Sequence, residues 1–598
     1  MHTPLFYGKI EFIPLKGVEK KGAPAVKDLK QEVALSLRQT IERVYPAAQG
    51  LPEDLSGLLE IPPEKKLGDY AFPCFKLSRS LRQAPPAIAQ ALQAAFDAPH
   101  LARAECAGGY LNFFLNRGNF AKSTLDAVLE AGARWGAGQE GAGKTVCLDY
   151  SSINIAKRFH IGHLSTTVLG NSLKKIFDFL GYKTVSINHL GDWGTQFGKM
   201  IAGYKHWGDR ETIEKGGVEE MTKLYVRFNQ EAEKDPALEE EGRAWFKKIE
   251  QGDEEALSIF RWFKDVTLKD AMRVYDILGV KFDSYAGESF YADKTGQVVE
   301  ELEQKGLLID SDGAKVVDLE EYGMPPCLIL KSDGATLYHT RDLAAALYRK
   351  NTYDFDQCLY VVAYQQDLHF RQLFKVLELM GYDWAKTQMK HVAFGMVSYE
   401  GQALSTRKGV MIYLDELLQR AQEKALDIIT EKSPNLENKE EIARQVGVGA
   451  VVYSTLQNGR IKDIDFRWDR ALNFDGETGP YVQYTHARCC SVLRKAPDLT
   501  SIAPDYAALD NDECQQLLLL LSRFPETVRD AADKYEPSFI TRAVTDLAKA
   551  YNKFYYEHRV LEESDPAGTL ARLLLTRAVK NVIRTGLTLI GVEAPERM

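Results

Sequence analysis

Apolar and polar residues alternate with two different periods in the first part of the chain. In segments 29–45 and 85–96 the apolar residues recur every three or four positions, as they do in amphipathic helices. Segment 108–116, GGYLNFFLN, is dense in aromatic and aliphatic residues and predicts a buried strand. We therefore expect an α+β domain over residues 29–130, preceded by an N-terminal extension, residues 1–28.

A strand, a helix and a second strand follow one another after this domain. TVCLDYS (145–151) and KTVSINHL (183–190) have the composition of buried strands. Between them, apolar residues from Leu164 to Leu180 fall mostly three or four apart, and Gly181 stands where a helix C-cap belongs. This βαβ order predicts a parallel, doubly wound sheet, in which ligands lie outside the carboxyl ends of the strands.

The rest of the chain combines further strands with long helical stretches. Strand-like runs recur as CLILKSD (327–333), CLYVVAY (358–364) and HVAFGMVS (391–398). Residues 204–275 are rich in charge and in helix formers, and from residue 442 onward nearly every segment has helical spacing.

The expected fold class is therefore α/β, with a Rossmann-like parallel-sheet domain between an α+β N-terminal domain and an all-α C-terminal bundle. The predicted ranges are 140–400 for the sheet domain with its helical insertion 204–275, 401–441 for a loop and connecting helices, and 442–598 for the bundle.

Composition narrows the class of protein. A length of 598 residues suggests about three or four domains, and 45% hydrophobic with 27% charged residues is ordinary for a soluble protein. No apolar run approaches the roughly 18 residues of a membrane span. The 8 cysteines show no C-x-x-C spacing, which argues against a zinc ribbon and a disulfide framework and favours a reducing cytoplasm. The net charge of −9 argues against a general nucleic-acid coat, although a local basic groove remains compatible with it.

NIAKRFHIGHLS, residues 154–165, places two of only 11 histidines three positions apart around a glycine. Taken alone, such a pair is best interpreted as two capped histidines near a helix start. A helix N-terminus also attracts phosphate, and His160 and His163 would add two donors to it. Gly162 has no side chain, so a nucleobase can lie directly on the backbone there.

Longer blocks around this motif decide between the two interpretations. HIGH at residues 160–163 resembles the signature of class I aminoacyl-tRNA synthetases. Seven blocks, in their order, resemble the arginyl-tRNA synthetases from about residue 30 to the final APERM. They are SSINIAKRFHIGHLSTTVLGNSL, NHLGDWGTQFGK, GES (287–289), KSDGATLYHTRDLAAA, QQDLHF, LSTRKG and TGPYVQYTHAR.

The resemblance implies a reaction and its substrates. L-Arginine and ATP would give arginyl-adenylate, and arginine would then pass to the terminal adenosine of tRNA(Arg). Mg²⁺ would accompany ATP without dedicated protein ligands, and no zinc or other protein-bound metal is expected. The resemblance further implies a cytoplasmic monomer with no membrane partner.

The second signature of class I enzymes, lysine-methionine-serine-lysine-serine, departs from its usual form here. The matching residues 403–407 read ALSTR, so both lysines are missing. The leaving pyrophosphate still needs cations. Arg407 and Lys408 in the loop are two candidates for this cation. Related enzymes that lack the second lysine imply a third, Lys157 of NIAK. By resemblance, His160 and His163 are also catalytic.

A guanidinium is best held by carboxylates, with a phenol or amide completing its donors. Tyr338 and Asp342 are four apart and share a face if they lie on one helix. By resemblance they bind the arginine side chain together with Glu288 and Asp149, although Asp149 serves equally well as a strand-end residue. Asn154 and Gln366 would hold the α-amino and α-carboxyl end.

By resemblance, ATP would contact a further set of residues: Gly162, Gly395, Met396, Val397 and Ser405. Asp192, Trp193, Gly194 and Gln196 would shape the floor of the site. The run around Gly395 is equally compatible with a simple core strand.

The bundle would read the anticodon, because GPYVQYTHAR alternates aromatic residues with His486 and Arg488, and such patterns stack bases and meet phosphates. Tyr481, Tyr484 and Arg488 are the predicted tRNA-binding residues, although a tyrosine of the bundle core explains Tyr484 equally well. The N-terminal domain would contact the tRNA elbow.

Two other functions share parts of this pattern. A class I synthetase for another amino acid would have HIGH and the sheet without these acidic residues. A non-catalytic tRNA-binding paralogue would have the bundle but lack His160, His163 or the pocket carboxylates, all of which are present.

Overall fold

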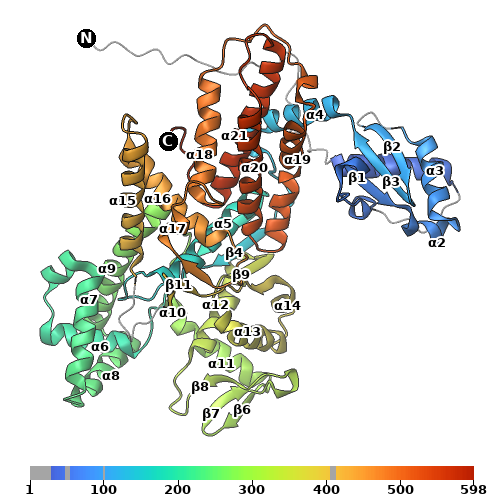
Figure 1. Ribbon diagram of the computed structural model, residues 1–598. Helices are drawn as coiled ribbons and strands as arrows, with labels where there is room; N and C mark the ends of the chain where they lie inside the picture. The colour runs from blue at the N-terminus through green and yellow to red at the C-terminus, as the bar shows by residue number, and fades with distance from the viewer. Residues whose placement is uncertain (1–28, 47–53, 98–100, 404–411) are drawn as a thin grey trace. The chain divides into compact units, whose positions relative to one another are not determined.

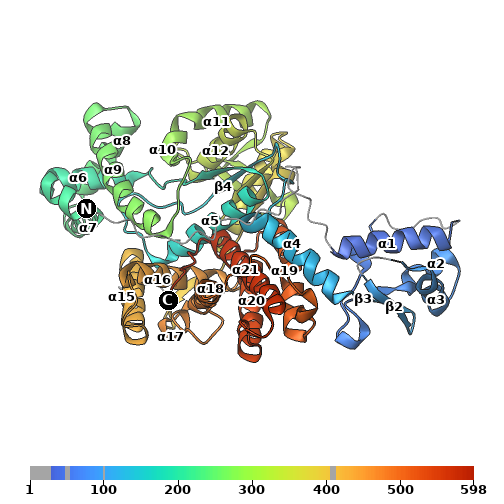
Figure 2. The same cartoon turned by 90° about the horizontal axis from the view of Figure 1, so that it is seen from above.

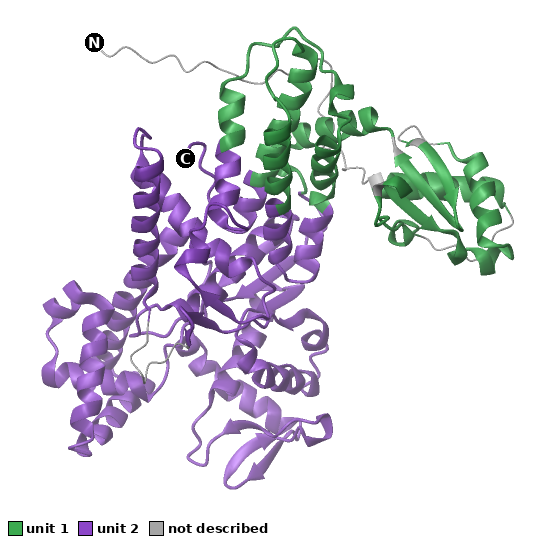
Figure 3. Ribbon diagram, in the orientation of Figure 1, with its two compact units in different colours: residues 1–136, 488–525, 546–583 green, residues 137–487, 526–545, 584–598 purple. Residues whose placement is uncertain are grey.

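The computed structural model describes residues 29–46, 54–97, 101–403 and 412–598. The chain forms two compact units (Figure 3). The first comprises the described residues up to Gly136 together with Arg488–Pro525 and Asp546–Ile583, and the second comprises Ala137–Ala487, Glu526–Thr545 and Arg584–Met598.

The first unit begins with the predicted α+β domain (Figure 1). An antiparallel sheet has the order β1-β3-β2, and Leu111 and Phe113 of β3 are completely buried. The predicted helices and the predicted strand are all present, and Asn116 caps the next helix by accepting a hydrogen bond from Asn119 N. The elements are α1 (Leu29–Val44), β1 (Tyr70–Pro73), α2 (Ser78–Leu81), α3 (Pro85–Ala95), β2 (Leu101–Ala107), β3 (Tyr110–Leu115) and α4 (Arg117–Ala131).

The second unit is built on a four-stranded sheet in which every pair is parallel, with the order β10-β9-β4-β5. The strands are β4 (Thr145–Asp149), β5 (Lys183–Ile187), β9 (Gln357–Tyr360) and β10 (Met389–His391). Helix α5 (Leu164–Phe179) connects β4 to β5, and Gly181 follows it with φ 86°, which confirms the predicted βαβ unit and its glycine. Since β5 and β9 lie on opposite sides of β4, the carboxyl end of β4 is a switch point where ligands bind in such sheets.

Two of the predicted strand-like runs lie outside this sheet. β8 (Cys327–Leu330) belongs to a separate antiparallel sheet with β6 (Leu308–Ser311) and β7 (Ala314–Val317). The run 391–398 is divided: its first residue ends β10, whereas its end forms β11 (Val397–Tyr399) in a third sheet. The division falls at Gly395, where an added Cβ would lie 2.4 Å from the carbonyl oxygen of Lys462.

The third sheet was only partly predicted. It joins β11 to β12 (Gln402–Ala403) and to β13 (Ile464–Phe466), in the order β12-β11-β13. β13 lies in a region that the sequence pattern predicts to be helical, because three residues are too few to show a period of two.

The insertion forms four helices that cluster together in both views (Figures 1 and 2). They begin at Thr195, before the predicted residue 204, and Asp209 and Asp253 cap two of them. Gly198 permits close packing, since a Cβ there would lie 2.0 Å from the carbonyl oxygen of Gly242. The helices are α6 (Thr195–Trp207), α7 (Arg210–Ala232), α8 (Ala237–Glu250) and α9 (Glu254–Leu278).

The remaining described residues are mainly helical, as the spacing predicted for the end of the chain. Helices α10 (Glu288–Tyr291), α11 (Thr295–Gln304), α12 (Tyr338–Tyr353), α13 (Asp367–Leu379) and α14 (Trp384–Gln388) accompany the sheets. They are followed by α15 (Leu414–Lys432), α16 (Lys439–Leu456), α17 (Trp468–Ala471), α18 (Gly479–Arg494), α19 (Asp512–Asp533), α20 (Ser538–Glu557) and α21 (Pro566–Leu589). Within the described ranges, none of these helices combines the length and apolar character needed to cross a membrane.

Candidate active site

The HIGH motif forms the short 3₁₀ turn Ile161–His163 directly before α5. The Nδ1 atom of His160 accepts a hydrogen bond from the amide of Gly162 (3.1 Å), and that of His163 accepts one from the amide of His160 (3.3 Å). A backbone N–H can only donate, so both Nδ1 atoms are acceptors and each neutral ring carries its proton on Nε2. The local fold therefore presents two Nε2–H donors side by side, with ring centroids 4.0 Å apart.

Both imidazoles are held in the neutral form. Burial lowers the pKa of His160, and the positive charge of Lys157 lowers it further. Burial, His160 and Lys157 together lower the pKa of His163 to about 3. These rings can donate hydrogen bonds to phosphate oxygens at neutral pH, but they contribute no positive charge.

The loop before HIGH places Asn154 and Lys157. Asn154 lies beside Gly191, because the amide of Gly191 donates to the carbonyl of Ile153 (2.9 Å) and the amide of Ile155 donates to that of Gly191 (3.2 Å). A Cβ on Gly191 would lie 2.3 Å from Oδ1 of Asn154, so a larger residue there would displace the Asn154 side chain. Lys157 is exposed and close enough to affect both histidines.

The carboxylate of Asp192 connects the GDWG block to the GES block. It is completely buried, and it accepts hydrogen bonds from Nζ of Lys264 (2.7 Å), from the amide of Ser289 (2.8 Å) and from its hydroxyl (2.7 Å). These bonds hold the first turn of α10, whose first residue is Glu288. Gly287 allows the approach, since a Cβ would lie 2.4 Å from the carbonyl oxygen of Leu190.

The other residues predicted to shape the floor of the site, Trp193, Gly194 and Gln196, lie where the helical insertion begins. Trp193 packs edge-on against Phe246 (5.3 Å between ring centroids) and Phe260 (6.5 Å). Gly194 is the N-cap of α6 with φ 140°, and Gln196 lies in the first turn of that helix. This packing orients α6 at the end of the block.

Tyr338 and Asp342 share one face of α12, as predicted, and both contact His369 of α13. Nε2 of His369 donates to Oδ2 of Asp342 (2.7 Å), and its ring centroid lies 5.3 Å from that of Tyr338. Burial is the largest single effect and would raise the pKa of Asp342, but the bond from His369 and the charges of the basic groups around it together keep the pKa below its ordinary value. His189 lies 3.7 Å from Oδ1 of Asp342, and Gln366 is exposed just before α13.

Glu288 is paired with the side chain of Arg341. Nε and Nη2 of Arg341 lie 2.9 Å and 2.8 Å from the same oxygen, Oε2, so the pair is not a two-oxygen fork. Burial nevertheless raises the pKa of Glu288 above its ordinary value.

Asp149 is engaged by a second internal guanidinium. Nη2 of the buried Arg349 lies 2.8 Å from its carboxylate and 3.3 Å from Nδ1 of His189. Because a guanidinium only donates, Nδ1 of His189 is an acceptor, and its neutral ring turns Nε2–H toward Asp342. Direct binding of arginine by Asp149 stays a prediction.

The predicted adenine contacts lie where the chain leaves the parallel sheet. The amide of Gly395 donates to the carbonyl of Arg460 (2.8 Å), and the amide of Met396 donates to Oδ1 of Asp463 (2.7 Å). These two amides are engaged within the protein, and Val397 begins β11. The predicted contacts Ser405, Arg407 and Lys408 lie outside the described residues, as does the extension 1–28.

In the predicted tRNA-binding helix α18, Tyr484 is 41% exposed and Tyr481 is half-buried. The exposure of Tyr484 favours a surface role over a core role. His486 is 1% exposed, and its Nδ1 lies 2.9 Å from the carbonyl oxygen of Pro595. The interpretation of His486 as a phosphate contact is therefore wrong, because its ring is buried and holds the C-terminal segment.

Arg488, the third predicted tRNA contact, is half-buried. It donates to Oδ1 of Asn552, and its guanidinium lies 5.1 Å from the ring centroid of Tyr555. Both contacts lie within the first unit. Arg488 would have to break them to extend its guanidinium toward a bound tRNA.

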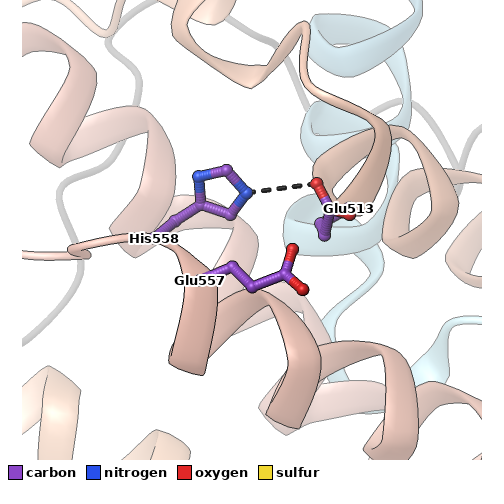
Figure 4. Close-up of side chains that lie close together, drawn as sticks. All are labelled: Glu513, Glu557 and His558. Atoms are coloured by element: carbon purple, nitrogen blue, oxygen red, sulfur yellow. Dashed lines mark hydrogen bonds and ion pairs between the residues drawn. The ribbon is translucent and has the colours of Figure 1, made fainter.

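One group of potential metal ligands occurs among the described residues: Glu513, Glu557 and His558, within 4.8 Å of one another (Figure 4). Glu513 accepts from Lys553 (2.9 Å) and from His558 (3.2 Å), and these bonds lower its pKa to about 2. A lysine ammonium thus already balances this carboxylate, and the group supports no metal site.

The basic partners of the acidic residues were not predicted. His189, Arg341 and His369 lie inside the blocks NHLGDWGTQFGK, KSDGATLYHTRDLAAA and QQDLHF, which was the available signal. Lys264 and Arg349 lie in ordinary helical sequence, and no local pattern distinguishes them.

Family models match three parts of the chain. "tRNA synthetases class I (R), catalytic domain" matches residues 124–468, "DALR anticodon binding domain" matches 482–598, and "Arginyl tRNA synthetase N terminal domain" matches 29–115.

Similar proteins cover nearly the whole chain. An arginine–tRNA ligase of Alkaliphilus metalliredigens is 50% identical over 572 residues, and one of Clostridioides difficile is 51% identical over 574 residues. Each match covers 96% of this chain and 100% of the relative. Among solved structures, the Thermus thermophilus arginyl-tRNA synthetase superposes with a TM-score of 0.79 at 28% identity, covering 95% of this chain and 100% of that one.

Proposed function

The chain belongs to the arginyl-tRNA synthetase family, and from this premise we propose which residues carry each part of its reaction. It activates L-arginine with ATP and transfers arginine to the 3′-terminal adenosine of its tRNA. The observation that carries this function is the 50% identity with an arginine–tRNA ligase over 96% of the chain. A class I enzyme for another amino acid and a non-catalytic paralogue do not account for that full-length match.

In the first step the α-carboxylate of arginine attacks the α-phosphorus of ATP. A new C–O–P linkage forms, and the bond to the β-phosphate oxygen breaks as pyrophosphate leaves. The nucleophile belongs to the substrate, so the enzyme contributes position and electrostatics rather than a nucleophile of its own.

The phosphate end of the site is assigned to the HIGH loop. The two neutral Nε2–H groups of His160 and His163 donate to the phosphate oxygens, and Gly162 leaves room for the adenine. Lys157 supplies the positive charge that the neutral rings lack, with Arg407 and Lys408 as the alternative cations. Mg²⁺ accompanies ATP and balances part of the triphosphate charge.

The guanidinium end is assigned to Asp342, Tyr338 and Glu288. The bond between His369 and Asp342 supports this assignment, because it favours the ionised form of Asp342 and orients the carboxylate for a second, cationic partner. Asn154 and Gln366 hold the α-amino and α-carboxyl groups.

The tRNA is assigned to both ends of the chain. Tyr481, Tyr484 and Arg488 bind the anticodon loop of tRNA(Arg). The match of residues 482–598 to an anticodon-binding family supports this for Tyr484 and Arg488, and Tyr481 directly precedes the matched range. Residues 29–115 contact the tRNA elbow, and the enzyme works as a cytoplasmic monomer.

Amino-acid-dependent ATP–pyrophosphate exchange tests the whole assignment. Each of the twenty amino acids is supplied in turn, with and without tRNA(Arg). Exchange should respond to arginine and require the tRNA. Strong exchange with lysine or glutamate would contradict the assignment of the pocket, and equal exchange without tRNA would remove the tRNA requirement.

A further inference from the structure

The loop between β4 and the HIGH turn is strained. Ser151, Ser152 and Ala156 have φ values of 71°, 47° and 63°, in the left-handed region that side-chain-bearing residues rarely adopt. The described residues contain nine non-glycine positions with a positive φ, and three of these nine fall within residues 151–156. Such a backbone persists only where neighbouring groups determine it.

Helix α9 of the insertion supplies one of these neighbouring groups at the end of the loop. The amide of Ala156 donates to Oγ1 of Thr267 (3.1 Å), whose own hydroxyl donates to the carbonyl of Phe263 (2.9 Å). Thr267 is 2% exposed, so water cannot replace this acceptor without a rearrangement. Ala156 directly precedes Lys157.

A directed chain of hydrogen bonds holds the start of the loop. Nδ2 of Asn188 donates to the hydroxyl of Tyr275 (2.8 Å), which contacts the hydroxyl of Ser151 (2.8 Å). Ser151 in turn contacts Oγ1 of Thr167 (2.8 Å), and Thr167 donates to the carbonyl of His163 (2.7 Å). Each hydroxyl has one proton, so the only consistent direction runs from Asn188 through Tyr275 and Ser151 to His163.

We propose that Thr267 and Tyr275 of α9 are positioning residues, which hold the loop in its strained form and so place Asn154 and Lys157 against the substrates. The insertion is then part of the catalytic apparatus of the second unit. This proposal rests on the roles assigned above to Asn154 and Lys157.

Thr267→Val tests the proposal, because valine keeps the shape of threonine and removes the acceptor for Ala156. An unsatisfied buried amide strongly disfavours the strained loop, so kcat of arginine-dependent exchange should fall about ten- to a hundredfold. The KM for ATP should change much less. Thr222→Val is the matched control: the Thr222 hydroxyl bonds to Val218 within α7 (2.8 Å), and the variant should exchange at the parent rate.

A second substitution separates positioning from general stability. Glycine adopts a positive φ without a Cβ penalty, so Ala156→Gly in the Thr267→Val background should restore kcat by a few-fold. Tyr275→Phe, which interrupts the hydrogen-bond chain but keeps the ring, should also lower kcat. Parent-rate exchange by Thr267→Val, or a loss that Ala156→Gly leaves unchanged, would overturn the proposal.

Hydrogen–deuterium exchange gives a readout that does not depend on activity. A peptide covering residues 150–159 should exchange faster in Thr267→Val than in the parent, and at the parent rate in Thr222→Val. Unchanged protection of this peptide in Thr267→Val would overturn the proposal that Thr267 holds the strained loop, even if the assigned reaction is correct. If the peptide exchanges deuterium faster in Thr267→Val but the parent protein does not activate arginine, the role of Thr267 in holding the loop stands and the proposed function is contradicted.

Discussion

The two ends of the proposed active site differ in how they hold charge. At the HIGH loop, two neutral imidazoles have their Nδ1 atoms satisfied by backbone amides, and burial keeps the pKa of each ring low. At the guanidinium end, three carboxylates are each paired with a basic side chain: Asp342 with His369, Glu288 with Arg341, and Asp149 with Arg349.

The difference agrees with what each end is proposed to bind. A phosphate can be held by neutral N–H donors that the backbone orients, and no charge then has to be buried in advance. A guanidinium needs carboxylates, and a partly buried carboxylate is tolerated only when it is paired and hydrogen-bonded. The proposed phosphate end is therefore preorganised by local chain geometry, and the proposed arginine end by long-range ion pairs.

The largest effect is expected from Asp342→Asn, which removes the charge facing the guanidinium while keeping the shape. Losing one partner of a buried pair typically costs about 3–5 kcal/mol, so the KM for arginine should rise by roughly two to four powers of ten. Steady-state exchange kinetics should show a much smaller change in the KM for ATP. Asp354→Asn, at the exposed end of the same helix, is the control. An unchanged arginine KM would show that Asp342 is structural.

Lys157→Ala tests whether Lys157, in the loop before HIGH, supplies the positive charge that the neutral histidines lack. A cation that acts mainly in the transition state should lower kcat for exchange by roughly 10²–10³, the range for one preorganised donor. The KM for ATP should change far less, because the additional charge develops only on the way to products. If Lys157→Ala exchanges at the parent rate while Lys408→Ala does not, the cation comes from the signature loop.

A smaller effect is expected from His369→Ala, which leaves Asp342 charged but removes its oriented partner. Hydrogen bonds to charged groups are worth about 1.5–3 kcal/mol, so the arginine KM should rise roughly 10- to 100-fold. His369→Gln retains an N–H donor and should lose less. Equal KM values for both variants and the parent would mean that the pairing of Asp342 does not prepare the pocket.

The last prediction concerns pH at the proposed phosphate end, where no change in the His163 ring is expected between pH 8 and pH 5. His163 has a folded pKa of about 3, below its unfolded value, so it should stay neutral from pH 8 to pH 5. ¹³C-histidine NMR, with His163→Gln to assign the resonance, should show no titration in this range. The stability that this neutral ring contributes is present above about pH 6.5 and is lost as the pH falls toward 3, by about 1.4 kcal/mol per unit. A midpoint near 6.5 would contradict a neutral donor.

Much of the fold near the site follows from local patterns. The unit β4-α5-β5 is specified by residues within about 45 positions, and the 3.6-residue period alone puts Tyr338 and Asp342 on one face. Local spacing could not distinguish the parallel sheet from the others, because β8 and β11 come from runs that are strand-like in the same way as the run containing β9. Sheet membership is decided by pairing with distant strands, and composition does not record that pairing.

The sequence by itself determined the family, the order of the motifs and most of the residues proposed to meet substrates, because those residues lie in short blocks whose chemistry can be interpreted locally. The tertiary structure alone decided what each of them is paired with. Arg341 reaches Glu288 across 53 positions, Lys264 reaches Asp192 across 72, and Thr267 reaches the strained loop across 111. Contacts of this kind depend on the packing of whole helices, so no local spacing predicts them.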